Sequence, residues 1–308
     1  MEQKKYDVII LGGGPAGLTA GIYLARGKAK TLILDTATIG GQMILTYQIA
    51  NYPGVEEISG YQLSAIMKKQ ATTFGCEIVS NIKINSLGLD SPVKKVTVNN
   101  KITYTAPAVI IATGGRSRML NVPGEPEFKG RGISYCATCD GDFFQDKEII
   151  VVGGGNSALE EAVALTKYAG KITIVHEFDH FQAFEHAVTE AKNNPKISFI
   201  MESHIVEFLG DESLKAVKIK NLKTGKINKM NTDGAFIFVG YEANTHQLKD
   251  TGLELNKWQE VVADENMNTN LKGVFVAGDS RAKRYRQVTT AVADGTIAAL
   301  SVLEYLNS

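Results

Sequence analysis

The chain contains the same local design twice, and this repeat limits the folds that it can adopt. Each copy has an apolar run of strand length, a glycine-rich turn, an amphipathic segment of helix length and a second apolar run. The copies span residues 6–34 and 147–175, and their turns read Gly12-Gly-Gly-Pro-Ala-Gly17 and Gly153-Gly-Gly-Asn-Ser-Ala158. Continuous apolar strands that alternate with helices are typical of parallel sheets covered by helices. We therefore predict an α/β fold with two three-layer, Rossmann-like nucleotide-binding domains.

The length of the chain and its other apolar runs predict how these domains are connected. A chain of 308 residues is long enough for about two domains. Three further apolar runs end in small residues, at 109–114, 235–240 and 274–279. Because the last run follows both copies of the repeat, we expect the C-terminal segment to complete the first domain. The predicted domains are therefore 1–116 with 247–308, and an inserted domain, 117–246.

The first glycine turn matches the pattern that binds dinucleotides. Gly12 permits a tight turn, Gly14 allows a pyrophosphate to approach the backbone, and Gly17 allows the helix to pack on the strand. The N–H groups at the start of the following helix attract phosphates. Asp35 ends the next apolar run, where its carboxylate would accept a ribose hydroxyl.

A second motif, Cys136-Ala-Thr-Cys139-Asp140, lies between the two copies. The chain has three cysteines, which are too few for a disulfide scaffold or for a zinc site of about four cysteine ligands. Cys76 is far away in the sequence, and we expect it to be a small core side chain. A redox dithiol is therefore favoured over zinc, and both over two unrelated buried thiols. Asp140 could deliver the proton that thiol–disulfide exchange requires.

Composition and charge disfavour several classes of partner. Lys+Arg and Asp+Glu both number 33, so the formal net charge is zero and no overall basic field attracts nucleic acid or an anionic membrane. Segment 8–25 is uncharged, but its many glycines favour a strand, a turn and a helix over a signal peptide or a membrane span. The low cysteine content indicates a reducing compartment, and we expect a cytoplasmic protein.

Together, these motifs resemble the low-molecular-weight thioredoxin reductase family nearly from end to end. The most specific shared element is Ser134-Tyr-Cys-Ala-Thr-Cys-Asp-Gly141. The resemblance implies a homodimer with FAD in the discontinuous domain and with thioredoxin as the substrate. It also implies that Cys139 faces the flavin, that Cys136 exchanges with thioredoxin, and that Asp140 is the general acid.

The same resemblance assigns positions to FAD. A carboxylate at Asp279 suits a ribityl hydroxyl, and the backbone and amide groups of residues 286–288 suit the flavin edge. The positions expected to bind FAD are Gly12, Gly14, Pro15, Ala16, Gly17, Asp35, Gly41, Gln42, Asn51, Thr113, Gly114, Gly278, Asp279, Arg286, Gln287 and Val288.

The second domain departs from the family where its second apolar run ends. NADPH-dependent relatives carry His-Arg-Arg-x-x-Phe-Arg there, and those guanidiniums bind the 2′-phosphate. This chain reads His176-Glu-Phe-Asp-His-Phe-Gln182, so Glu177, Phe178 and Gln182 replace the three arginines. Asp179 adds a further negative charge, and NADPH is therefore a poor candidate.

Several interpretations of segment 176–182 are open. We favour reduced ferredoxin as the electron donor, because the chain then resembles the ferredoxin-dependent flavin thioredoxin reductases, which lack the NADPH signature. A basic cluster of Arg281, Lys283, Arg284 and Arg286 could steer such an acidic carrier. Alternatively, Glu177 could accept a ribose hydroxyl of NADH, and NADPH is a weaker third choice.

A zinc-protease site and a purely electron-transferring flavoprotein receive less support. Residues 176–180 spell the zinc-protease pattern H-E-x-x-H, but that motif needs a helix, and we expect no metal. A flavin electron-transfer protein of the ferredoxin–nicotinamide reductase type would lack a thiol substrate, and the cysteine pair argues against it.

Overall fold

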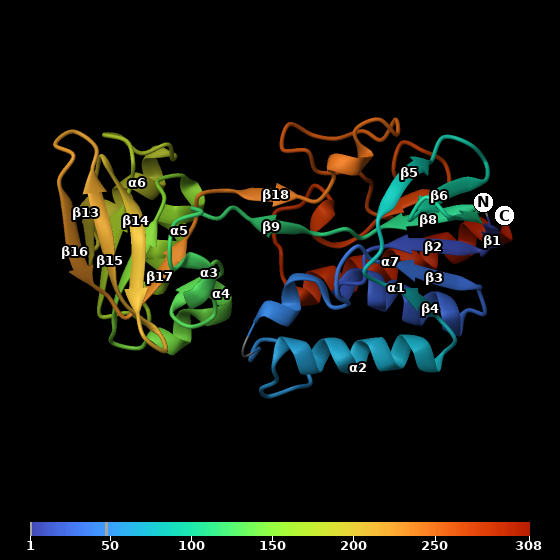
Figure 1. Cartoon of the computed structure of the whole chain (residues 1–308), viewed down its shortest axis with the longest axis horizontal. Helices are drawn as coiled ribbons and strands as arrows, with labels where there is room; N and C mark the ends of the chain where they lie inside the picture. The colour runs from blue at the N-terminus through green and yellow to red at the C-terminus, as the bar shows by residue number, and fades with distance from the viewer. Residues whose placement is uncertain (1, 47–48) are drawn as a thin grey trace. The chain divides into compact units, whose positions relative to one another are not determined.

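The chain divides into two compact units in the computed structural model, which describes residues 2–46 and 49–308 (Figure 1). Unit 1 contains Met1–Arg116 and Glu242–Ser308, and unit 2 contains Ser117–Tyr241. Unit 2 ends at Tyr241, whereas the inserted domain expected from the sequence extends to residue 246. The reason is local, because strand β18 (Tyr241–Ala243) pairs with strand β9 (Gly115–Ser117). The two connections between the units therefore run beside each other.

Unit 1 is built around a five-stranded sheet in which all neighbouring strands are parallel. In spatial order its strands are β19 (Val274–Val276), β8 (Ala108–Ile111), β2 (Val8–Leu11), β3 (Thr31–Leu34) and β4 (Glu77–Val79). A second sheet contains β1 (Glu2–Lys5), β7 (Ile102–Ala106), β6 (Lys94–Val98) and β5 (Ile84–Gly88). The helices are α1 (Pro15–Arg26), α2 (Gly60–Thr73) and α7 (Val288–Asn307), with short 3-10 turns η1 (Gly41–Leu45), η3 (His246–Leu248) and η4 (Gly278–Ser280).

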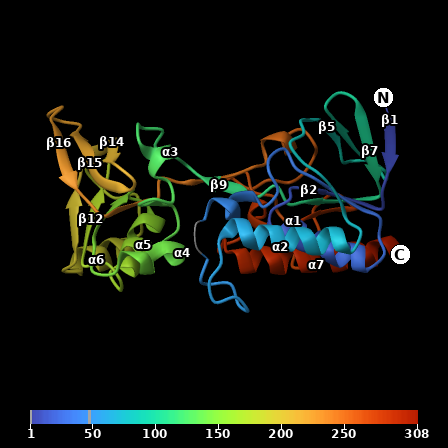
Figure 2. The same ribbon diagram turned by 60° about the horizontal axis from the view of Figure 1, so that its bottom comes forward.

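The two faces of the parallel sheet explain why its strands are continuously apolar. Val8 and Ile10 of β2 pack in a core with α1, α2 and α7, whereas Ile9 and Leu11 pack in a core with the second sheet. Figure 2 shows α1, α2 and α7 lying together along this unit. A strand that is buried on both faces needs an apolar side chain at every position, and each fully buried side chain contributes about 1.5–3 kcal/mol.

Unit 2 repeats this three-layer plan. Its parallel sheet contains β10 (Ile133–Ser134), β17 (Gly234–Ile237), β11 (Glu148–Val152), β12 (Lys171–Val175) and β13 (Ile197–Ile200) in spatial order. An antiparallel sheet contains β14 (Ser203–Gly210), β15 (Leu214–Asn221) and β16 (Ile227–Asn231). Its helical segments are α3 (Glu125–Phe128), α4 (Ala137–Asp140), η2 (Gly141–Phe144), α5 (Asn156–Leu165) and α6 (Glu185–Asn193).

The predicted α/β fold with Rossmann-like parallel sheets is confirmed. Helices α1 and α5 begin inside the glycine turns, because Gly14 and Gly155 of these turns are themselves the N-caps. Segment 8–25 forms β2, a turn and α1, as the glycines predict. Across residues 2–46 and 49–308, no helix combines the length and the apolar character that a membrane crossing requires.

Candidate functional site

The turn between β2 and α1 depends on its glycines. Gly12 has a φ of +110°, and a Cβ atom there would lie 2.1 Å from the carbonyl oxygen of Ala112. A Cβ atom on Gly17 would lie 1.9 Å from the carbonyl oxygen of Gly12. No side chain caps the N-terminus of α1, which Pro15 opens. The first N–H groups of a helix have no partner within the helix, so this end of α1 can donate hydrogen bonds to a phosphate.

The carboxyl ends of β8 and β19 lie beside this turn, because both strands belong to the same parallel sheet as β2. Thr113 and Gly114 follow β8, and Gly278 and Asp279 follow β19. A Cβ atom on Gly278 would lie 2.8 Å from the Cβ of Ala16, so η4 packs directly on the first turn of α1. The Oγ1 atom of Thr113 is buried and has no hydrogen-bond partner within the described residues, and it therefore suits a bound polar ligand.

Asp35 and the loop after it complete the same edge of the sheet. Gly13 N–H donates to Asp35 Oδ2 at 2.6 Å, and Ala37 N–H donates to Oδ1 at 2.8 Å. Burial nevertheless raises the pKa of Asp35, although these two hydrogen bonds oppose the shift. Gly41 lies against Gly14, since a Cβ atom on Gly41 would be 3.2 Å from the Gly14 Cα. Gln42 follows and is exposed.

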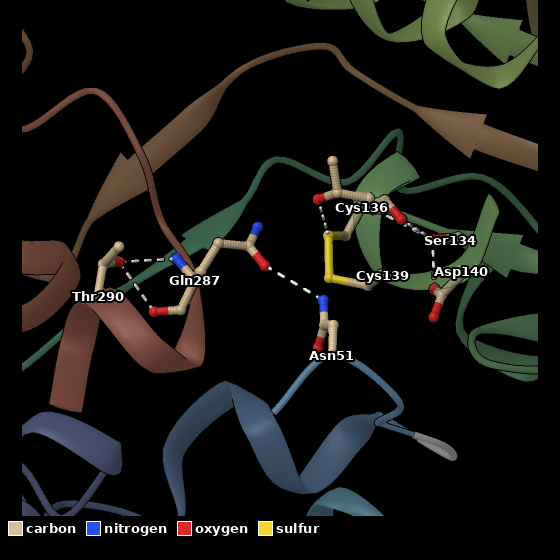
Figure 3. The surroundings of a disulfide bond; sticks show 8 residues. Asn51, Ser134, Cys136, Cys139, Asp140, Gln287 and Thr290 are labelled. Carbon is tan, nitrogen blue, oxygen red and sulfur yellow. Dashed lines mark hydrogen bonds between the residues drawn. A yellow bond between two sulfur atoms is a disulfide. The ribbon is translucent and has the colours of Figure 1, made fainter. Parts of the chain in front are cut away.

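Asn51 and Gln287 meet at the start of α7. The side-chain amide of Asn51 donates to Gln287 Oε1 at 3.5 Å (Figure 3). Gln287 is the N-cap of α7, and its N–H donates to the Thr290 hydroxyl at 3.0 Å. Unit 1 thus gathers the glycine turn, Asp35, Asn51, Thr113, Asp279 and Gln287 on the elements that meet at this edge, while Gln42 lies exposed beside Gly41.

Ion pairs to carboxylates involve most of the basic cluster at 281–286. The Lys283 side chain is only 7% exposed, and its Nζ lies 3.1 Å from both Asp279 Oδ1 and Asp294 Oδ2. Arg281 pairs with Asp294 at 3.3 Å, and Arg286 pairs with Glu260. Three of the four cations therefore face carboxylates. Burial raises the pKa of Asp279, and Lys283 and then Arg286 oppose that shift.

The dithiol lies in unit 2, on the single turn of helix α4. Cys136 and Cys139 form a disulfide with their Cα atoms 5.3 Å apart. Cys136 is the N-cap, and its carbonyl accepts the N–H groups of Cys139 at 3.3 Å and Asp140 at 3.2 Å. Its Sγ lies 3.5 Å from the Thr138 hydroxyl. Both cysteines and Asp140 are half-buried, so the disulfide and its acid neighbour are both partly accessible to solvent.

Asp140 is held by Ser134, the last residue of β10. The Ser134 hydroxyl lies 2.6 Å from Asp140 Oδ2, and the same oxygen accepts the Cys136 N–H at 3.1 Å (Figure 3). Burial raises the pKa of Asp140, the Ser134 hydrogen bond opposes this shift, and the charge of Asp142 adds to it. A carboxyl with a raised pKa retains a proton closer to neutral pH and is suited to act as an acid.

The glycine turn of unit 2 has the same backbone geometry as that of unit 1. Gly153 has a φ of +136°, and a Cβ atom there would lie 2.4 Å from the carbonyl oxygen of Phe238. No side chain caps the start of α5. The His176 ring packs on Gly154, where a Cβ atom would come within 2.4 Å of it. Gln182 N–H donates to the Gly154 carbonyl at 2.8 Å, so segment 176–182 folds back over the turn.

The charges in segment 176–182 are those that the sequence predicts. Glu177 and Asp179 are exposed, and Asp179 pairs with His180 at 2.7 Å. Burial lowers the pKa of His176, so this imidazole adds no positive charge near neutral pH. The segment is not helical, so it lacks the helix on which the H-E-x-x-H motif places its two imidazoles. Residues 2–46 and 49–308 hold no group of three or more metal-ligating side chains.

Sequence reasoning missed the partners of these site residues. Ser134 belongs to the shared motif, yet nothing in its spacing indicates a bond to Asp140. Lys283 stands four residues after Asp279, a spacing that could have suggested the pair, whereas Asp294 and Glu260 come from other segments. Their roles become visible only in the fold.

Comparisons with known proteins agree with this geometry. The family model described as "Pyridine nucleotide-disulphide oxidoreductase" matches residues 6–295. A thioredoxin reductase of Peptoclostridium acidaminophilum is 44% identical over 99% of this chain and 98% of its own length. The "34.2 kDa protein in rubredoxin operon" of Clostridium pasteurianum is 43% identical, with coverage of 99% and 98%. The crystal structure of thioredoxin reductase from Streptococcus pyogenes MGAS5005 matches with a TM-score of 0.94 and 40% identity, covering 98% of each chain.

Proposed function

The chain belongs to the pyridine nucleotide-disulphide oxidoreductase family, and from this premise we propose that it is an FAD-containing thioredoxin reductase that receives electrons from reduced ferredoxin. The observation that carries the proposal is the Cys136–Cys139 disulfide with the half-buried Asp140, whose pKa is raised, beside it. Two of the relatives that are more than two-fifths identical over nearly the whole chain are thioredoxin reductases.

FAD fits the residues of unit 1. The uncapped start of α1 would hold the pyrophosphate, and Asp35 would accept a ribose hydroxyl. The buried Thr113 Oγ1 and the Asp279 carboxylate would contact other polar groups of the cofactor. Bound FAD supplies two-electron transfer to a disulfide. This assignment makes unit 1 the FAD-binding domain and unit 2 the domain that carries the dithiol.

The dithiol residues have distinct roles in the proposed reaction. When the Cys136–Cys139 bond accepts two electrons, the S–S bond breaks and Asp140 provides a proton to the departing sulfur. The Cys136 thiolate then attacks the thioredoxin disulfide, which forms a mixed disulfide and releases one thioredoxin thiolate. Cys139 attacks the mixed disulfide, which regenerates the Cys136–Cys139 bond and leaves thioredoxin reduced.

The electron donor is proposed from charge. A 2′-phosphate must lose much of its hydration on binding, and guanidinium partners normally offset that cost. Glu177 is exposed at the position of one of those partners, Asp179 is exposed two residues later, and His176 is neutral near pH 7. Reduced ferredoxin needs no such pocket. Three of the four cations in the basic cluster pair with carboxylates. The donor proposal therefore depends on segment 176–182 and not on a basic docking surface.

NADH is the second candidate donor. The turn at 153–158 retains its geometry, and Glu177 is exposed directly after β12, where an acid can accept a ribose hydroxyl. NADH lacks the 2′-phosphate, so the two acids would not repel it.

A homodimer is also part of the proposal. Tyr23 of α1 and Ile297 and Leu300 of α7 are exposed apolar side chains on two helices that pack together. Exposed apolar side chains that gather on one face are typical of protein interfaces.

The proposed function is tested without any physiological donor. The purified protein is expected to release FAD when it is denatured, and dithionite-reduced protein is expected to reduce about two equivalents of thioredoxin disulfide per subunit, one from the dithiol and one from the reduced flavin. Free thioredoxin thiols, counted after removal of dithionite, give the measurement. Release of FMN would contradict the cofactor proposal, and unreduced thioredoxin would contradict the substrate proposal.

A further inference from the structure

The Ser134 hydroxyl lies at the centre of three short contacts. Its oxygen is 2.6 Å from Asp140 Oδ2, 3.3 Å from the Cys136 carbonyl oxygen and 3.1 Å from the Cys136 nitrogen, whose N–H it accepts. Ser134 is buried, whereas Asp140 and Cys136 are half-buried, so the hydroxyl itself depends on these contacts more than its partners do. The hydroxyl therefore links the acid to the backbone of the cysteine that exchanges with substrate.

We propose that Ser134 is a positioning residue that allows Asp140 to gain and lose a proton without losing its hydrogen bond. This inference rests on the proposed function, in which Asp140 donates a proton as the disulfide opens. A serine hydroxyl has one donor and two acceptor positions. These positions are enough to satisfy both protonation states of Asp140.

In the ionised state, the Ser134 O–H donates to Asp140 Oδ2 and Ser134 Oγ accepts the Cys136 N–H. In the protonated state, the Asp140 O–H donates to Ser134 Oγ, which still accepts the Cys136 N–H. The Ser134 O–H then turns to the Cys136 carbonyl, which lies 3.3 Å away. No buried polar atom of the three residues is left without a partner in either state, and an unpaired buried group would be costly.

The transferred proton moves from the Asp140 carboxyl to a cysteine sulfur. When two electrons reduce the disulfide, supplied by bound flavin or by a small dithiol, the S–S bond breaks and both cysteine sulfurs become thiolates. The Asp140 O–H bond breaks, an S–H bond forms, and Asp140 becomes a carboxylate. The hydroxyl of Ser134 then turns back from the Cys136 carbonyl to the new carboxylate, where a charge-assisted bond is stronger.

The groups around Asp140 determine whether a Ser134 variant raises or lowers the pKa of Asp140. Asp142 of η2 disfavours the carboxylate, as burial does. From α5 and the turn after it, Leu165 and Tyr168 pack against the neighbouring Gly141. The donor of Ser134 favours the carboxylate and opposes burial and Asp142, so its removal raises the pKa of Asp140 further.

The experiment is a pH titration of the oxidised full-length protein labelled with 13C at aspartate carboxyl carbons. The Asp140 resonance is identified by its absence in Asp140→Asn. Ser134→Ala is expected to raise the titration midpoint of the Asp140 carboxyl by about one pH unit, which corresponds to a tenfold change in its acid dissociation constant. Ser134→Thr, which keeps the hydroxyl, is expected to retain the wild-type midpoint. The matched control is Ser198→Ala, whose hydroxyl bonds to Thr173 in the same unit.

An unchanged Asp140 midpoint in Ser134→Ala would overturn the proposal, as would an equal shift in Ser134→Thr. If Ser134→Ala does not fold, Ser134→Cys provides the same test, because a thiol of similar size is a weak donor and must also raise the midpoint. The titration uses neither thioredoxin nor an electron donor. An unchanged Asp140 midpoint would therefore leave the proposed function intact, and a failure to reduce thioredoxin would leave the titration valid.

Discussion

Cys136 and Cys139 belong to one turn of helix, but their surroundings differ. The Sγ of Cys136 lies 3.5 Å from the Thr138 hydroxyl, and a hydroxyl donor there stabilises a thiolate. Cys76, in contrast, is buried among apolar side chains, and burial raises the pKa of its thiol to about 12. Because the thiolate is the reactive form of cysteine, Cys136 is suited to attack and Cys76 to remain inert.

This difference predicts the behaviour of cysteine variants. Cys139→Ser is expected to trap thioredoxin as a stable mixed disulfide through Cys136, because no second thiol can resolve it. Cys136→Ser is expected to trap none, and both variants should lose turnover. The measurement is non-reducing electrophoresis with oxidised thioredoxin after brief reduction of the variant, with Cys76→Ala as the control that keeps turnover. Trapping by Cys136→Ser instead would reverse the two roles.

For single residues, the sequence predicts which chemical groups are present better than it predicts their hydrogen-bond partners. The spacing of Cys136, Cys139 and Asp140 is enough to identify a dithiol with a nearby acid. The bond from Ser134 to Asp140 could not be predicted, because it depends on how the end of β10 lies beside α4.

Among the elements, η4 is important because it carries Asp279 and is fixed by charges from elsewhere in unit 1. Asp294 of α7 accepts the Gly278 N–H at 3.1 Å and lies 3.1 Å from Lys283 Nζ. The same ammonium group lies 3.1 Å from Asp279. Lys283 therefore joins the candidate flavin ligand Asp279 to α7, and its removal leaves two carboxylates without this buried counter-charge.

Lys283→Met is accordingly expected to weaken FAD binding and to lower the free energy of unfolding by about 3 kcal/mol, since it breaks a buried charge network. Arg284→Met is the matched control, because Arg284 is exposed and lies over the Tyr285 ring. FAD affinity is measured by titration of the FAD-free protein, and stability by its urea unfolding. Equal losses in the two variants would contradict the role assigned to Lys283.

The elements themselves were largely predictable, and their charged contacts were not. Strands β2, β3, β11 and β12 follow from continuous apolar runs bounded by glycine turns. The ion pairs of the basic cluster were not predictable, because a run of Arg and Lys carries no information about Glu260 and Asp294, which reach it only in the folded unit.

For the whole molecule, the comparison of the two units bears most on function. In unit 1, Asp35 follows β3 and accepts the Gly13 N–H. In unit 2, His176 occupies the matching position after β12 and packs on Gly154. The backbone designs agree, so the difference lies in the charges at the strand ends. Unit 2 has neutral His176 followed by acidic Glu177, which disfavours a ligand with an extra phosphate.

The repeat and the late apolar runs were sufficient to predict two α/β units in one chain. The residue at which the chain returns from unit 2 to unit 1 was not predictable, because it depends on the pairing of β18 with β9 rather than on composition. The electron donor is likewise not encoded by a single motif, since it is inferred from the absence of three arginines.

Anaerobic rapid mixing of the oxidised holoenzyme with reduced ferredoxin, NADPH or NADH tests the central claim most directly, with bleaching of the flavin absorbance as the signal. We predict fast bleaching by ferredoxin, a one-electron iron–sulfur carrier of which two equivalents are consumed for each flavin reduced, and negligible bleaching by NADPH. The triple variant Glu177→Arg, Phe178→Arg, Gln182→Arg should gain NADPH-dependent bleaching, because it restores guanidinium partners for the 2′-phosphate. Rapid bleaching of the wild-type flavin by NADPH or by micromolar NADH, with none by ferredoxin, would contradict the account.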